Sequence, residues 1–331
     1  MRPPARLLAP VFVLLATPPH YANAQTSSPD SIVPDSARVE LRTDPSEREL
    51  SEPTRVVVLG TGNPIPDARR FGPGIAVIHK GESYLFDVGS GVIQNATRAR
   101  YRYDIPSLYP TQICCVFLTH LHSDHTLDYV ELSFTMWWRR FNRVLAFGPT
   151  GLKSMTEGML AMMQPDIRVR ESGSQPVNAP VARIYEPLVT EISEGVVFEK
   201  DDLVVEAFKV NHGDIRPAFG YRITTDDKSI VISGDTAFSE TLIEKARGVD
   251  LLFHEAISDA GLLRTSEAFQ AYHKRSHTTA TELARVARAA LPGKLVVYHV
   301  LYYGLPEQTV LDEIRRDYDG EVVLANDLDL F

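Results

Sequence analysis

The sequence FLTHLHSDHTLD, residues 117–128, places three of the chain's ten histidines within six residues. His120, His122 and His125 are interleaved with Asp124, and the apolar run ICCVFL leads into them. Imidazole and carboxylate groups are the usual protein ligands of Zn²⁺. We therefore expect a buried strand to end here at a metal site.

Three more residues of ligand type also follow apolar runs. His212 comes after VVEAFKVN, Asp235 after SIVISG and His299 after KLVVY. Open sheets place their sites where strand ends meet on one rim. Two divalent ions about 3.5–4 Å apart, bridged by a water whose pKa falls to about 7, would use all of these donors. The expected metal ligands are His120, His122, Asp124, His125, His212, Asp235 and His299.

Short apolar runs alternate with amphipathic patterns from Thr54 to Phe331. Runs such as RVVVLGTG (55–62) and SYLFDVGSG (83–91) end at glycine or aspartate, as strands do. Helical patterns cover Leu127–Arg140, Leu152–Met163, Ser239–Arg247, Thr278–Ala290 and Glu307–Tyr318. Two mixed β-sheets that face each other, with helices outside, would bury all of these apolar faces.

The stretch THLHSDH (119–125) resembles the His-x-His-x-Asp-His signature of the metallo-β-lactamase superfamily. The segments VLGTGNPIPD, YLFDVGSG, VNH, SGDT, HEA, SHTTATELA and YHV extend the resemblance over Val56–Phe331, and the last of them bring it closest to the ribonuclease Z and arylsulfatase-like branch. This resemblance implies a four-layer αββα sandwich of the α/β class, with a dinuclear centre that usually holds zinc.

The resemblance also assigns each ligand to an ion. It implies that His120, His122 and His212 bind the first metal, that Asp124, His125 and His299 bind the second, and that Asp235 bridges both. True β-lactamases lack the bridging aspartate, so Asp235 disfavours penicillin-type substrates.

His277 suggests a substrate class, because it stands at the expected start of the 278–290 helix. Free N–H groups at a helix N-terminus favour a bound anion, and a histidine there can bind or protonate an ester oxygen. In ribonuclease Z-like enzymes the matching histidine serves substrate phosphate and catalysis, supported by the HEA glutamate, here Glu255. We expect His277, Asp124 and Glu255 to be catalytic; a helix cap and a structural carboxylate are the alternatives for His277 and Glu255.

The sequence predicts supporting or structural roles for several other polar residues. Asp87 should support the metal site from a turn, His254 should be a hydrogen-bonded core histidine, and His273 should lie at the surface. Cys114 and Cys115 are the only cysteines. Neighbouring cysteines rarely bond to each other because the geometry is strained, so we expect two buried thiols.

The chain's first residues differ in composition from the rest. Residues 1–24 have the layout of a secretory signal peptide, with basic residues, a ten-residue apolar run and the small-residue site ANA. Residues 25–53 are rich in Ser, Pro and charge and are expected to be a disordered linker before the hydrolase domain, 54–331. These features predict an exported protein, periplasmic or secreted, without a membrane anchor.

Charge argues against a nucleic-acid partner. The formal net charge is −9 and becomes −11 when residues 1–24 are removed, because Arg2 and Arg6 leave with no acid. A phosphate backbone needs a cationic surface. Short ribonuclease Z forms also carry a long basic arm between the third-histidine and GDT segments, whereas Gly213–Gly234 has room only for a hairpin.

These observations favour a dinuclear metallohydrolase that cleaves a phosphodiester or sulfate ester of a small molecule, with a metal-bridging hydroxide as nucleophile. Zn²⁺ suits the ligands best, and Mn²⁺ or Fe²⁺ tolerate the same donors. The alternatives are a lactonase or other carboxylic-ester hydrolase, a ribonuclease Z-type tRNA endonuclease, and a non-catalytic metal-binding scaffold. A homodimer is possible.

Overall fold

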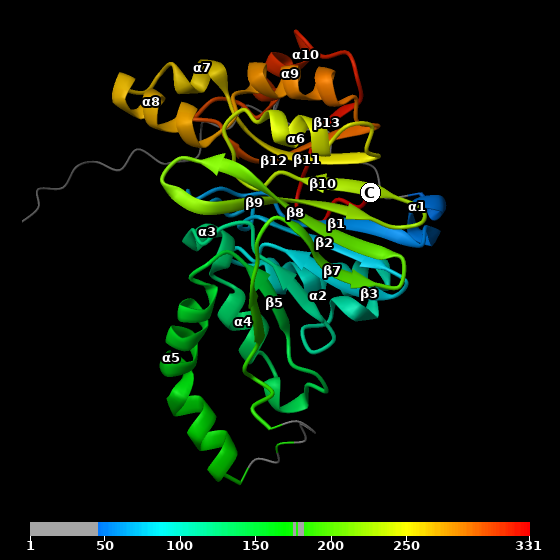
Figure 1. Ribbon diagram of the computed structural model, residues 1–331, viewed down its shortest axis with the longest axis vertical. Coiled ribbons are helices and arrows are strands. Elements are labelled where there is room, and N and C mark those ends of the chain that lie inside the picture. The colour runs from blue at the N-terminus through cyan, green and yellow to red at the C-terminus, as the bar shows by residue number, and fades with distance from the viewer. Residues whose placement is uncertain (1–45, 175–176, 178–181) are drawn as a thin grey trace, which may run out of the picture. The chain divides into compact units, whose positions relative to one another are not determined.

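Two mixed β-sheets stack face to face in the computed structural model (Figure 1), which describes residues 46–174, 177 and 182–331. One sheet has the order β1 (Thr54–Gly60), β2 (Gly74–His79), β3 (Glu82–Phe86), β4 (Cys115–Phe117), β5 (Leu145–Gly148) and β6 (Leu188–Glu191). The other has the order β13 (Val322–Leu324), β12 (Lys294–Leu301), β11 (Leu251–Ile257), β10 (Ser229–Ile232), β9 (Ile215–Thr224), β8 (Leu203–His212) and β7 (Gly195–Lys200). Strand pairs are parallel from β3 to β6 and from β10 to β13, and antiparallel elsewhere.

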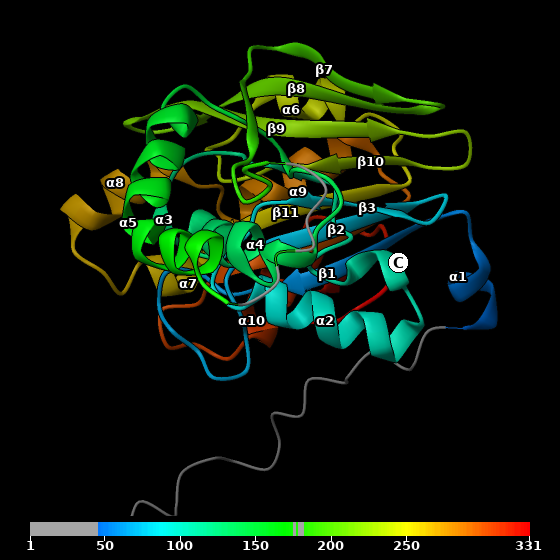
Figure 2. The same cartoon turned by 90° about the horizontal axis from the view of Figure 1, so that it is seen from below.

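The alternation of side chains along β1 shows how the layers form. Val56 and Val58 pack between the sheets, whereas Val57 and Leu59 face the helices outside the first sheet. That outer layer contains α2 (Val92–Tyr103), α4 (Tyr129–Phe134) and α5 (Leu152–Ser172), which cover the first sheet on the side seen in Figure 2. The helices α6 (Glu240–Lys245), α9 (Ala280–Ala290) and α10 (Gln308–Arg315) cover the second sheet. The predicted αββα sandwich is confirmed.

Two helix predictions need correction. The pattern over Leu127–Arg140 forms α4 and a 3-10 turn, Trp137–Arg139, because Met136 adopts a left-handed φ of 50° between them. The helix α5 continues past Met163 to Ser172 with Pro165 inside it. Pro165 is exposed, so water can reach the carbonyl that proline leaves unpaired.

Five further helical segments complete the described residues. They are α1 (Glu47–Ser51), α3 (Ser123–Thr126), α7 (Asp259–Leu262), α8 (Glu267–Ser276) and the 3-10 turn Pro106–Leu108. The predicted signal peptide and residues 25–45 of the predicted linker lie outside the described residues, and α1 lies within the linker's last residues. Among the described residues, no helix combines the length and apolar character that a membrane span requires.

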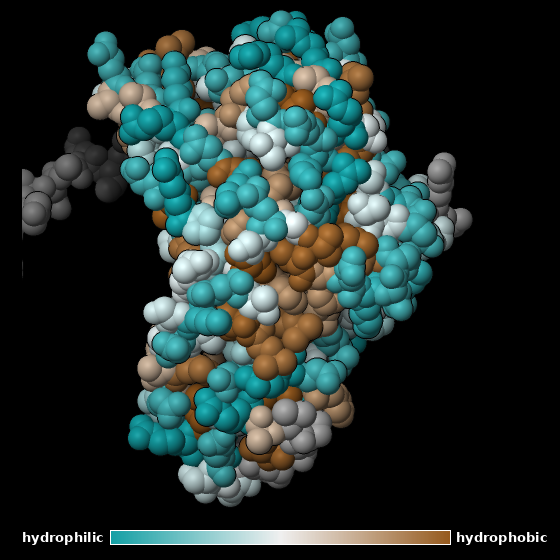
Figure 3. All heavy atoms as spheres, in the orientation of Figure 1, coloured by the Kyte–Doolittle hydropathy of each residue, from teal (hydrophilic) through white to brown (hydrophobic). Residues whose placement is uncertain are grey.

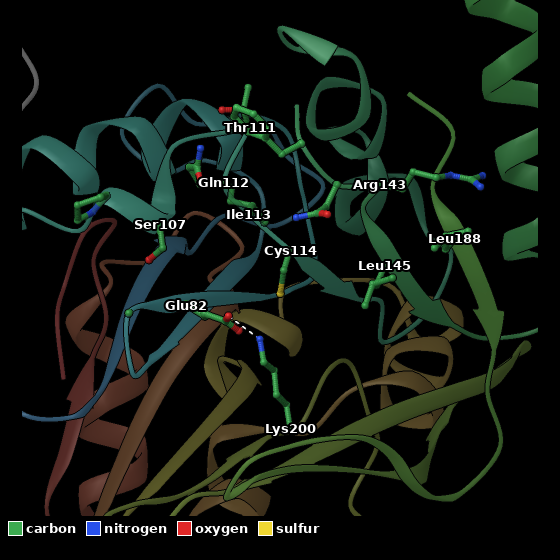
Figure 4. A pocket seen from close by; sticks show the side chains of 14 residues that line it. Glu82, Ser107, Thr111, Gln112, Ile113, Cys114, Arg143, Leu145, Leu188 and Lys200 are labelled. Atoms are coloured by element: carbon green, nitrogen blue, oxygen red, sulfur yellow. Dashed lines mark hydrogen bonds and ion pairs between the residues drawn. The ribbon is translucent and has the colours of Figure 1, made fainter. Parts of the chain in front are cut away.

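The expectation of two free thiols is wrong, because Cys114 and Cys115 form a disulfide with each other. Cys114 precedes β4, which begins at Cys115, so strand alternation does not force the two sulfurs apart. Cys114 also lines a hollow of about 720 Å³ at the starts of β3, β4 and β5, the strand ends opposite those that carry the histidines (Figure 4). Apolar side chains gather in the middle of the face shown in Figure 3. Leu188, which lines the hollow, is 46% exposed, and Val196 on β7 is 56% exposed.

Candidate dinuclear metal centre

The predicted ligands all lie at one edge of the sandwich, where strands from both sheets end. The loop after β4 carries His120 and His122, and α3 carries Asp124 and His125. The second sheet supplies the other three from the end of β8, from the turn after β10 and from β12; they are His212, Asp235 and His299. The structure therefore brings together all seven predicted metal ligands.

Backbone geometry turns two of these side chains toward the centre. His299 has a φ of 48°, and the register of β12 with β11 shifts at this point. Its N–H donates to the carbonyl of Thr61 at 3.1 Å, outside the sheet. Gly234, just before Asp235, has a φ of 59°, and a Cβ there would lie 2.8 Å from the Cβ of Thr119. Only glycine lets the two sheets approach so closely at this edge.

The first three-histidine group lies on the β8 side of the edge. The Nδ1 of His122 is 3.0 Å from the Nε2 of His120 and 3.1 Å from the Nε2 of His212. Nitrogens that share one zinc ion at bonds of about 2.0–2.1 Å are separated by roughly this much. The three rings can therefore hold one ion.

The second group lies on the β12 side. The Nε2 of His299 is 3.2 Å from both the Nε2 of His125 and the Oδ2 of Asp124. The Nε2 of His125 lies 3.5 Å from the same Asp124 oxygen. This set of two imidazoles and a carboxylate can hold a second ion.

Asp235 lies between the two groups. Its Oδ2 is 3.7 Å from the Nε2 atoms of His212 and His299, and its Oδ1 is 3.4 Å from the Nε2 of His125. The Oδ1 atom is buried without a hydrogen-bond partner. A buried carboxylate among converging imidazoles fits a cation better than it fits any other occupant.

Outer partners determine which ring nitrogens face the centre. The Nδ1 of His125 is 2.8 Å from the Oδ2 of Asp87, and the Nδ1 of His212 is 2.7 Å from the carbonyl of Ser276. Because these acceptors require an N–H on Nδ1, the Nε2 atoms of both rings face the centre and are the atoms that would bind an ion. Asp87 also accepts from the N–H and hydroxyl of Thr119, both at 2.8 Å, as expected of a supporting residue.

The site's electrostatics also favour cations. Burial lowers the pKa of His120 well below its ordinary value, so this imidazole is neutral. Burial alone would raise the pKa of Asp235, but His299 and His125 outweigh it and hold that pKa well below its usual range. Burial alone would lower the pKa values of His125 and His299, but Asp235 outweighs it and holds both above the ordinary value. The centre is thus an ionised carboxylate among imidazoles, where a bound cation would replace the protons on these two rings.

His277 lies beside this centre but not where the sequence suggested. It follows α8, and α9 begins only at Ala280, capped by Thr279. The Nδ1 of His277 is 3.3 Å from the Oε1 of Glu255, which also accepts from the N–H of Thr278 at 3.0 Å. Glu255 therefore takes the N–H group that was expected to bind an anion.

The environment of His277 keeps a proton on its ring. Burial alone would lower its pKa, but Glu255, and more weakly Asp235, raise it to about 9. Its Nδ1 is 3.9 Å from the Oδ2 of Asp235, which places the ring at the side of the metal centre. His277 can therefore donate a hydrogen bond to an anion there.

Two other histidines were assigned from sequence. His254 is buried, with its Nδ1 2.7 Å from the carbonyl of Glu255, as expected for a core histidine. The surface expectation for His273 is wrong, because only 6% of it is exposed and its ring is 5.3 Å from that of His277. The spacing of four residues between the two histidines is one helical turn and was the available signal. It was missed because α8 was not predicted.

Comparison with known proteins identifies the class. A family model described as a beta-lactamase superfamily domain matches residues 82–300, and the chain belongs to this superfamily. Its members are metal-dependent hydrolases.

Individual relatives show which members of the superfamily this chain is similar to. Ribonuclease Z of Mycobacterium sp. (strain KMS) is 33% identical over 251 residues, which cover 74% of this chain and 84% of the relative. The metallo-beta-lactamase fold protein YhfI from Bacillus subtilis has a TM-score of 0.63 at 18% identity and covers 85% of this chain and 99% of its own. Human tRNase Z, short form, has a TM-score of 0.59 at 22% identity, and the alignment covers 84% of this chain and 98% of the human chain. The two structures share the fold.

Proposed function

We propose that this protein is a dinuclear metal-dependent hydrolase that cleaves an ester of an anionic group, with a phosphodiester as the leading substrate class and a sulfate ester next. The observation that carries the proposal is the convergence of seven donor side chains beside a histidine that is paired with a buried glutamate. The similarity to ribonuclease Z, by name an enzyme of RNA, favours phosphorus over sulfur.

Each residue of the site has a role in this proposal. His120, His122 and His212 would hold one ion, Asp124, His125 and His299 would hold the other, and Asp235 would serve both. When bound, divalent ions supply Lewis-acid polarisation of the ester and acidify water. Zn²⁺ suits these donors best, and Mn²⁺ and Fe²⁺ are alternatives.

His277 acts on the substrate rather than on the metals. The carboxylate of Glu255, 3.3 Å from Nδ1, stabilises the protonated ring, which can then donate to a non-bridging or departing ester oxygen. Asp87 and Ser276 orient the ligands His125 and His212 and do not contact substrate.

A ribonuclease Z-type endonuclease is the second candidate, and the 33% identity to such enzymes favours it. The segment between His212 and Asp235 gives it no support. It is filled by β9, β10 and short turns, and β9 begins three residues after His212. A small-molecule ester therefore remains the leading substrate, and a carboxylic-ester or lactone substrate is a further alternative.

The test uses purified protein that is stripped with a chelator and reloaded with Zn²⁺, Mn²⁺ or Fe²⁺. Its hydrolysis of aryl phosphodiesters, aryl sulfates, lactones and a precursor tRNA is then measured together with bound metal. Asp235→Ala should lose metal and activity together, whereas the exposed Asp214, in the β8–β9 turn, can be changed to Ala without loss of either. His277→Ala should retain metal and lose turnover of anionic esters.

Three results would count against the proposal. Undiminished hydrolysis in the Asp235→Ala protein would refute the metal mechanism. Two bound ions without turnover of any ester would indicate a non-catalytic scaffold. Turnover of lactones alone would exclude an anionic ester.

The proposal also includes that the protein is exported in soluble form and that its substrate is a small molecule rather than a nucleic acid. These two points stand on residues 1–24 and on the formal charge of −9. Expression in a Gram-negative host, followed by fractionation and N-terminal sequencing, should give a periplasmic protein that begins at Gln25. An intact chain in the cytoplasm would contradict export. Sedimentation of the same sample would test the proposed homodimer.

A further inference from the structure

His299 is oriented differently from the other candidate ligands that face the centre through Nε2. Those three each have an oxygen within 2.7–3.0 Å of Nδ1; they are His120, His125 and His212. Among the described residues, the Nδ1 of His299 has no hydrogen-bond partner, although it is buried. A ligand histidine is ordinarily oriented by a hydrogen bond on its other nitrogen. The ring of His299 therefore depends on its backbone for its position at the second ion.

The backbone of His299 is held from outside its own sheet. Its φ of 48° lies in the left-handed region, which a residue with a side chain keeps only where the surrounding structure enforces it. The register of β12 with β11 shifts at this point, and the N–H of His299 donates to the carbonyl of Thr61 at 3.1 Å. The position of Thr61 thus sets the direction of the His299 side chain.

Thr61, which follows β1, is held in turn by two charged side chains. Its N–H and its hydroxyl both donate to the Oδ1 of Asp327, at 2.9 and 2.7 Å. Its hydroxyl oxygen also accepts from the guanidinium of Arg70 at 2.7 Å. Thr61 is only 3% exposed, so it cannot shift without breaking a buried hydrogen bond to a charged group.

Asp327 divides its hydrogen bonds between two sets of neighbours. Its Oδ1 takes both bonds from Thr61, whereas its Oδ2 accepts from the N–H of Phe71 at 2.8 Å and from the Nδ2 of Asn95 at 3.1 Å. Only the Oδ1 side leads through Thr61 to His299. The two oxygens of one carboxylate can therefore be tested separately.

We propose that Thr61 and Asp327 are positioning residues for the second ion. The carboxylate fixes Thr61, and the carbonyl of Thr61 fixes the backbone of His299 and so the Nε2 atom that would bind the ion. This inference rests on the proposed function only in requiring a site for two ions. It goes beyond that function, because it assigns a role to two residues that are 266 positions apart and are neither metal ligands nor substrate contacts.

The geometry of the second group leaves little freedom for His299. Its Nε2 is 3.2 Å from both the Nε2 of His125 and the Oδ2 of Asp124. Metal sites tolerate ligand displacements of about 0.2 Å. A small shift of Thr61 is therefore enough to weaken the second ion while the sandwich stays folded.

The test uses competitive chelator titrations of the whole protein with Zn²⁺, in which Asp124→Ala identifies the step that belongs to the second ion. Thr61→Val keeps the size of the side chain but removes the hydroxyl that bonds Asp327 and Arg70. It should weaken the second ion by about 10–100-fold, the range for lost supporting residues, and leave the first ion unchanged. Thr61→Ser retains the hydroxyl and should keep most of the wild-type affinity.

Asn95→Ala is the matched control, because it removes hydrogen bonds to the Oδ2 of the same carboxylate and to the carbonyl of Leu59. Thr61→Val and Asn95→Ala should each lower the melting temperature by about 2–4 °C, and only Thr61→Val should weaken the second ion. Asp327→Ala should lower both quantities further. Combining it with Thr61→Val should cost no additional affinity, since the two residues act through one another. If Asp327→Ala does not fold, the comparison of Thr61→Val with Asn95→Ala decides.

Several results would overturn the positioning role. They are wild-type affinity for the second ion in Thr61→Val, an equal fall for both ions, and an equal fall in Asn95→Ala. If only the second ion is weakened in Thr61→Val but the wild type hydrolyses no ester, the proposed function fails and the positioning role stands. If esters are hydrolysed and Thr61→Val binds both ions like the wild type, the positioning role fails alone. A wild-type protein that binds fewer than two ions would overturn both.

Discussion

Gly89 tests whether the backbone behind the metal ligands is as tightly constrained as the structure indicates. A Cβ at this position would lie 2.3 Å from the carbonyl oxygen of Asp124 and 2.5 Å from the carbonyl carbon of Gly72. Both are backbone atoms, so no side chain can turn away to make room. Gly89 has an ordinary φ, and its replacement by alanine therefore adds only this steric conflict.

The size of the expected effect follows from these distances. Ordinary contact begins near 3.4 Å, so the α3 segment with Asp124 must move by about 1 Å. Metal sites tolerate ligand displacements of about 0.2 Å. Gly89→Ala should therefore weaken binding of the second ion by about 10–100-fold, the range seen when supporting residues are lost. Overpacking should also lower the free energy of unfolding by about 1–3 kcal/mol.

The assay is metal content by mass spectrometry at limiting Zn²⁺, combined with urea unfolding with and without chelator. Gly158→Ala is the matched control, because Gly158 lies in the middle of α5 with nothing near its added Cβ. That change should leave metal binding alone and raise stability by about 0.5–1 kcal/mol. If Gly89→Ala binds both ions with wild-type affinity and unfolds like the wild type, the steric reasoning is wrong.

Three further changes probe other parts of the structure. Asp87→Asn presents an amide N–H to the Nδ1 of His125, which favours the wrong tautomer, so affinity for the second ion should fall about 10–100-fold in a competitive chelator titration while the far-ultraviolet spectrum stays unchanged. Leu283→Ala opens a cavity under α9, where the side chain is fully buried, and should cost about 3–5 kcal/mol in urea unfolding; a loss below 1 kcal/mol would show that the helix repacks. Thr279→Ala removes the capping box of α9 and should cost about 1 kcal/mol, most of which Thr279→Ser should recover; equal losses in both variants would show that the cap hydroxyl is not what matters.

The strands and the ligand set were readable from the sequence because each is a local pattern. An apolar run that ends at a histidine or aspartate needs no knowledge of its neighbours to be noticed. The helix α8 escaped prediction since its sequence, EAFQAYHKRS, buries only His273 and Ser276 and so shows no regular apolar stripe. The misplacement of His273 followed from that omission.

The disulfide and the position of His277 show a different limit. Whether Cys114 and Cys115 can bond depends on where β4 begins, and pairing with neighbouring strands decides that point. The N–H of Thr278 looked free to bind an anion until β11 placed Glu255 against it. The disulfide depends on strand pairing, and the bond from Thr278 to Glu255 depends on the packing of β11, so no local sequence pattern predicts either of them.

The order of residues alone determined that strands rich in Val and Ile would deliver histidines and aspartates at their ends, because burial and alternation act over a few neighbouring positions. The resemblance already implied that Asp235 would serve two groups of donors and that Glu255 would support His277. Only the folded chain decided the distances among these groups and placed His273 unsatisfied among aromatic rings. These arrangements join side chains from two sheets and several loops, and only the packing of the layers brings such distant residues within a few ångströms of one another.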